Sequence, residues 1–119
     1  SLGGGAVGPG SLQRAEQLAQ RGAHDDAARE YEKLAEDNPG SAGIGYLLAA
    51  AREWLAANRP ADARRVLALF SGTPTAAQSA ELRLLEIDLL LAAGEGQRAW
   101  QQLEAAGMPR EPAAQLQYY

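Results

Sequence analysis

Residues 46–70 read YLLAAAREWLAANRPADARRVLALF, and this stretch decides the expected fold. Apolar side chains recur at three- and four-residue spacings on both sides of Asn58, which is the spacing of one face of an α-helix. Asn58 can adopt the left-handed conformation that ends a helix, and Pro60 suits the first turn of the next helix. The stretch therefore predicts two helices joined by a short turn.

The same pattern recurs along the chain at an offset of 36 residues. Ala27, Ala63 and Ala99 occupy one equivalent position, where a small side chain lets two antiparallel helices cross closely. The aligned turn residues are Gly22, Asn58 and Gly94. Self-similarity at a fixed period of this length is typical of helical-repeat proteins. Ala and Leu dominate the apolar residues, which also favours an all-α fold.

The repeats divide the chain into helical hairpins over about residues 11–39, 41–72 and 75–107, with a partial fourth at 110–119. Residues 11–119 are thus expected to form one helical repeat domain. Residues 1–10 contain five of the 13 glycines. Ordering so many glycines costs backbone entropy, so this segment is expected to be a flexible linker or a remnant of cloning.

Residues 21–39, RGAHDDAAREYEKLAEDNP, resemble the second half of a tetratricopeptide repeat. The match comprises the turn glycine Gly22, the packing residue Ala27, the aromatic Tyr31 and the closing Pro39. The period exceeds the usual length of about 34 residues, and the first helices lack the usual Trp, Leu, Gly and Tyr signature. The resemblance implies a tetratricopeptide-like solenoid of about three hairpins plus the start of a fourth.

A narrower resemblance covers residues 41–119. There YLLAAAREWLAANRPADARRVLALF is followed by ELRLLEIDLLLAAGEGQRAWQQLEAAG and PAAQLQYY, and the whole is similar to the N-terminal domain of the LpoA family. These are outer-membrane lipoproteins that activate a class A penicillin-binding protein, and a periplasmic-binding-protein-like domain follows their helical domain. The synthase contact is generally assigned to that C-terminal domain.

This resemblance implies a protein-binding scaffold on the periplasmic side of the outer membrane, with a class A penicillin-binding protein as partner. Membrane attachment would come only through a lipid anchor upstream of Ser1. The alternative is a cytoplasmic tetratricopeptide adaptor that binds a peptide or a helix. A lipobox cysteine in the upstream sequence would distinguish the two.

Composition argues against several other functions. A net charge of −4 and a pI near 4.9 disfavour nucleic acid and anionic lipid as partners. Without cysteine there is no thiolate nucleophile, and the single histidine, His24, is expected to be solvated in a turn. Asp25 and Asp26 are expected to favour the start of the following helix. We therefore expect no enzyme activity, no cofactor and no metal site.

The concave side of a hairpin solenoid, formed by the first helix of each hairpin, normally binds the partner. Projecting these helices away from their packed side gives the candidate partner-binding residues Glu16, Gln20, Leu48, Arg52, Leu55, Leu84, Asp88 and Leu91. Arg52 and Asp88, one repeat apart, are expected to form a salt bridge. The leucines would form an apolar strip, for a partner helix or for another part of the same protein.

Two further groups of side chains have expected positions. Periodicity places Glu30, Glu32 and Lys33 on the solvated side of their helix. Trp54 and Trp100 fall in apolar stripes and are expected in the core or in the packing between hairpins, rather than as platforms for a ligand.

Overall fold

The computed structural model describes residues 10–107, which contain helices and no β-strand. The helices are α1 (Leu12–Gln20), α2 (His24–Asp37), α3 (Ile44–Ala56), α4 (Pro60–Leu67), α5 (Ala76–Ala92) and α6 (Gly96–Ala105), with a 3₁₀ turn, η1 (Gly40–Gly43), before α3. The predicted all-α class is confirmed. Residues 1–9 of the linker expected at 1–10, and the expected start of a fourth hairpin at 110–119, lie outside the described residues. Gly10 is described, and its backbone N–H donates to Oδ2 of Asp37 at 3.0 Å.

The turns that end α1, α3 and α5 use the predicted residues. Gly22, Asn58 and Gly94 have φ angles of 82°, 59° and 77°, and Asn58 is the one non-glycine residue with positive φ between residues 10 and 107. Asparagine tolerates this conformation better than most side chains do. The predicted left-handed turns at Gly22 and Asn58 are confirmed. Pro60 also stands in the first turn of α4, as predicted.

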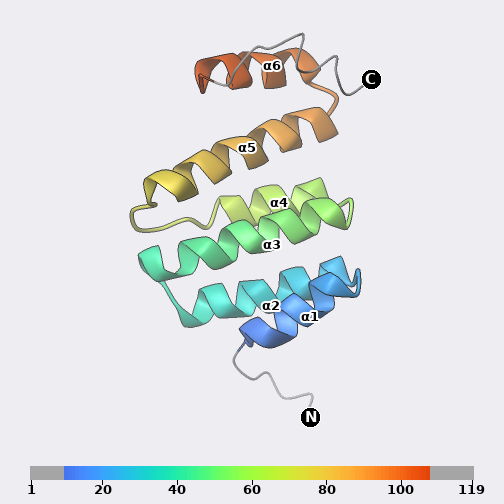
Figure 1. Cartoon of the computed structure of the whole chain (residues 1–119), viewed down its shortest axis with the longest axis vertical. Helices are drawn as coiled ribbons and strands as arrows, with labels where there is room; N and C mark the ends of the chain where they lie inside the picture. The colour runs from blue at the N-terminus through green and yellow to red at the C-terminus, as the bar shows by residue number, and fades with distance from the viewer. Residues whose placement is uncertain (1–9, 108–119) are drawn as a thin grey trace.

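Consecutive helices pair along the chain: α1 packs on α2, α3 on α4, and α5 on α6 (Figure 1). α3 also packs against α2 and α5, so the pairs are layered along the long axis of a molecule measuring 54 × 32 × 22 Å. Ala27 and Ala63 are fully buried, and Ala99 is 1% exposed. A small side chain at these positions allows the close helix crossings.

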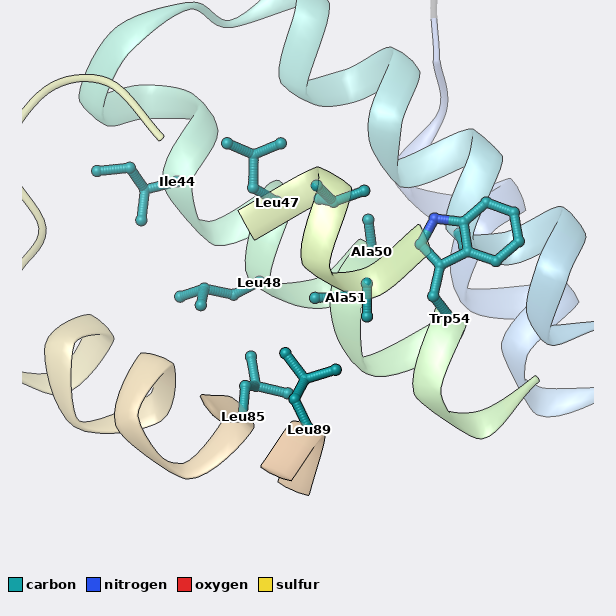
Figure 2. Packing of buried hydrophobic residues seen from close by; sticks show 11 residues of the cluster. Ile44, Leu47, Leu48, Ala50, Ala51, Trp54, Leu85 and Leu89 are labelled. Carbon is teal, nitrogen blue, oxygen red and sulfur yellow. The ribbon is translucent and has the colours of Figure 1, made fainter. Parts of the chain in front are cut away.

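The hydrophobic core is centred on α3, because this helix has neighbours on several sides. Its buried side chains gather with residues of α2, α4 and α5 (Figure 2). The cluster comprises Ala28, Ile44, Leu47, Leu48, Ala50, Ala51, Trp54, Ala63, Val66, Leu85 and Leu89. Trp54 is 2% exposed, as expected for an interior residue. Trp100 keeps 39% of its surface exposed and is therefore not a core residue, which leaves packing between hairpins as its expected role.

The carboxylates of α2 contradict the expectation of a solvated charged face. Glu30 is only 5% exposed and accepts the backbone N–H of Ser11 at 2.9 Å. Arg14 and Lys33 form ion pairs with Glu30, at 3.6 and 3.5 Å. A buried carboxylate is tolerated when hydrogen bonds and opposite charges replace the water it loses. Glu30 therefore ties α1 to α2.

Glu32 joins α2 to the second helix pair. It accepts the indole N–H of Trp54 at 2.7 Å, and both terminal nitrogens of Arg65 donate to its two oxygens at 2.9 Å. The hydrogen bond with Glu32 raises the pKa of Arg65 above its usual value. Arg29 and Arg59 lie 5.3 and 4.6 Å from the centre of the Trp54 ring, within the range of cation–π attraction. Glu32 thus holds α2 against α3 and α4 and does not lie on a solvated face.

Candidate protein-binding surfaces

The predicted binding residues do not all reach the surface. Glu16 and Gln20 are exposed on α1, and Arg52 is exposed on α3. Leu55 is half-buried. Leu48 is 1% exposed and belongs to the core, so its assignment to the binding face is wrong. In Figure 2, Leu48 points toward the helix that carries Leu85 and Leu89, because α5 covers this part of α3.

The expected salt bridge between Arg52 and Asp88 is absent from the described part of the chain, and Arg52 pairs with Glu81 instead. Repeat-equivalent residues occupy equivalent places in successive helix pairs and need not touch each other. Here Arg52 reaches a residue about two turns before Asp88 on α5. The pair still connects α3 with α5, and it leaves Asp88 exposed without an ion pair among residues 10–107.

Two leucines flank Asp88 on one face of α5. Leu84 is 45% exposed and Leu91 is 55% exposed. Side chains at positions i, i+4 and i+7 of a helix lie on the same face, so these leucines and Asp88 form one row. We call Leu84, Asp88 and Leu91 the α5 strip. It is the largest part of the predicted apolar strip that remains accessible.

Several polar side chains from α1, α2 and α3 lie near one another around His24 and Tyr31 of α2. His24 is the first residue of α2, not a turn residue, and its Nδ1 lies 2.7 Å from Oε1 of Glu53. Burial raises the pKa of Tyr31, and the nearby charges of Glu16 and Glu53 raise it further, while Arg52 opposes them. Within residues 10–107, no group of three or more histidine, cysteine or acidic residues could hold a metal ion.

Asp25 and Asp26 stand in the first turn of α2, and Oδ1 of Asp25 accepts the backbone N–H of Asp26 at 3.0 Å. Both carboxylates interact with Arg29 in the next turn, at 3.8 and 3.2 Å. They therefore support the start of the helix through this hydrogen bond, through attraction to the positive end of the helix and through the ion pairs to Arg29.

The hollows of the described structure include a pocket and a wider cleft. A pocket of about 230 Å³ lies where the end of α2, η1 and the end of α4 meet, with Glu36, Leu47 and Leu69 among its walls. A wider cleft of about 620 Å³ lies between α4, α5 and α6. Its lining comprises Arg64, Leu67, Ala68, Glu86, Leu89, Leu90, Ala93, Glu95 and Arg98. We call it the α4–α6 cleft, and sequence reasoning did not predict it.

No protein-family model matches the chain, and neither a curated protein nor a solved structure does. No helix within residues 10–107 combines the length and the apolar character needed to cross a membrane.

Proposed function

We propose that this chain is a non-catalytic, tetratricopeptide-like module that binds another protein through the side formed by α1, α3 and α5. Three features support the repeat architecture: the layered helix pairs, the left-handed turns 36 residues apart, and the buried alanines at the same period. The observation that supports binding is the α5 strip. Two large apolar side chains half exposed on one helix face suit an apolar partner surface.

The α5 strip is too small to account for the whole binding free energy of a partner. Full burial of a leucine contributes about 1.5–3 kcal/mol, so burying two half-exposed leucines contributes roughly that amount in total. A Kd of 1 μM corresponds to about −8 kcal/mol, before the entropy lost on association is counted. The strip therefore supplies only part of the binding free energy. Further contacts would come from Arg52, which pairs with Glu81 of α5, and from Glu16 and Gln20 on the more distant helix α1.

The specific form of this proposal is a scaffold of an outer-membrane lipoprotein that activates peptidoglycan synthesis by a class A penicillin-binding protein. It rests on the resemblance of residues 41–119 to the LpoA family. In this form the module lies on the periplasmic side of the outer membrane. The alternative form is a cytoplasmic adaptor that binds a peptide or helix on the same face, and both forms require the α5 strip to be accessible.

Affinity capture tests the proposal. The chain of residues 1–119 is compared with its Leu84→Ser/Leu91→Ser variant in extracts of cell envelope and of cytoplasm. Arg83→Ala is the matched control, because Arg83 is also exposed on α5 but lies outside the strip. We expect a class A penicillin-binding protein to be captured from the envelope and to be lost only with the leucine variant.

The outcomes separate the parts of the proposal. Capture of a specific cytoplasmic partner in place of the synthase would support the adaptor form. If the leucine variant captures every partner as well as the unaltered protein does, binding through the α5 strip is refuted.

A further inference from the structure

The two junctions between successive helix pairs differ at equivalent positions. At the first junction, where α2 packs against α3, Ala28 and Ala50 are both fully buried. An offset of 36 residues leads from Ala28 to Arg64 on α4 and from Ala50 to Glu86 on α5. Both charged residues are exposed, and both line the α4–α6 cleft. The second junction thus has two charges where the first has two alanines.

This substitution accounts for the cleft. Two alanines let the helices approach closely, whereas arginine and glutamate need water or a partner around their charges. Arg64 and Glu86 form no ion pair with each other or with other described residues. The adjacent Arg65, by contrast, is paired with Glu32 and Asp62. The charges of Arg64 and Glu86 are therefore available to a ligand.

Beside these charges the cleft is apolar. Leu67 of α4 and Leu89 and Leu90 of α5 line it, and the pair Glu95–Arg98, 2.6 Å apart, lies on the α6 side. Its volume of about 620 Å³ is within the roughly 300–1,000 Å³ typical of binding pockets. An open trough with helices on its sides and leucines within it, and with Arg64 and Glu86 as charges that have no ion pair among the described residues, suits the helix-in-groove mode of recognition.

We propose that the α4–α6 cleft is a second binding site, which takes a short amphipathic helix of a partner protein. Leucine-type side chains of that helix contact Leu67, Leu89 and Leu90. An acidic side chain pairs with Arg64 and a basic one pairs with Glu86. The charge order fixes the direction in which the helix lies.

The cleft is separate from the α5 strip of the proposed function. Successive residues of an α-helix are rotated by about 100°, so Glu86 lies about 200° around α5 from Leu84. The two sites therefore face nearly opposite sides of α5, and each can fail without the other. The inference does not depend on the proposed partner.

The experiment selects ligands from a displayed library of 16-residue peptides biased toward helix, with leucine, alanine, glutamate and lysine randomised. The full chain is compared with an Arg64→Glu/Glu86→Arg variant. We expect the unaltered chain to enrich peptides with leucines at i, i+3 or i+4 and a fixed order of acidic and basic residues. The variant should enrich the reverse order and bind the original peptides at least about tenfold more weakly, the loss expected when close charge pairs become like-charge contacts.

Two control variants locate the peptide. Arg83→Ala and Leu84→Ser/Leu91→Ser lie outside the cleft, and both should keep the affinity within about twofold, since surface changes away from the contact have little effect. Because Arg64 and Glu86 are exposed, the charge-reversal variant should also keep the thermal stability of the unaltered chain.

Four outcomes would overturn the proposal. The library could yield no enriched peptide, or the same charge order could be selected by both forms of the protein. Loss of binding in the leucine variant would place the peptide on the α5 strip. Sedimentation that shows a dimer of the unaltered chain and a monomer of the charge-reversal variant would make a second copy of this chain the occupant.

Discussion

Replacing Ala63 with leucine tests whether close helix crossings hold the fold together. Ala63 has no exposed surface and packs in the core with residues of α3 such as Ala51 and Trp54. The larger side chain would push α4 away from α3 or force its neighbours from their preferred rotamers. Overpacking of this kind costs about 1–3 kcal/mol. Since 1 kcal/mol shifts the Tm of a small domain by roughly 4–8 °C, the Tm should fall by at least about 4 °C.

The matched control is Ala61→Leu, because Ala61 lies on the same helix but is exposed. Alanine and leucine both have high helix propensity, so this change should leave the Tm nearly unaltered. Thermal unfolding followed by circular dichroism measures both variants, and urea unfolding should show a lower midpoint for Ala63→Leu with the same slope. Equal Tm values for the two variants would refute the close-crossing argument.

Three other substitutions test single interactions. Glu32→Ala leaves the Trp54 indole N–H without its acceptor and should lower the free energy of unfolding, measured in urea, by about 1–3 kcal/mol. The control is Glu36→Ala, because Glu36 is exposed on the same helix. An equal effect of the two substitutions would contradict the role of Glu32. The pKa of Tyr31 is raised in the folded state, so the protonated phenol stabilises the fold below about pH 10, and this stability is lost as the pH rises through the folded-state pKa. Tyr31→Phe should therefore make the Tm fall less steeply at high pH. An unchanged dependence of Tm on pH would contradict this role of Tyr31. Thr75→Ala removes the capping box of α5 and should cost about 1 kcal/mol by thermal unfolding, whereas a loss below a few tenths would assign the cap no role.

Local features of the sequence predicted the helices and turns. The left-handed turns at Gly22 and Asn58 depend on the conformational preferences of single residues, and helix periodicity depends on neighbours within two turns. Burial of Ala27, Ala63 and Ala99 followed from their common period. Each of these features depends only on residues within one hairpin, so it can be predicted from the local sequence.

Features that depend on distant parts of the chain were predicted poorly. Leu48 and Leu84 are repeat-equivalent, yet Leu48 is 1% exposed and Leu84 is 45% exposed. The difference arises because α5 covers Leu48. Glu32 looked like a surface residue because its donors, Trp54 and Arg65, lie 22 and 33 residues away. The position of a charged residue in a periodic pattern does not show whether a later helix places a hydrogen-bond donor beside it.

The α4–α6 cleft was missed although the sequence contains its cause. The repeat alignment pairs Ala28 with Arg64 and Ala50 with Glu86. Each difference alone predicts only a charged surface residue. Considered together, and with the knowledge that Ala28 and Ala50 are buried, they predict that the second junction cannot close as the first does.

The order in which the helices pack also affects how the molecule opens. Within residues 10–107, every extensive contact between α-helices joins helices that are adjacent or next but one in the chain. Short loops of this kind close at little entropic cost, so contact order is low and folding should be fast. Amide hydrogens of α3, which packs on α2, α4 and α5, should be among the last to exchange as the molecule opens.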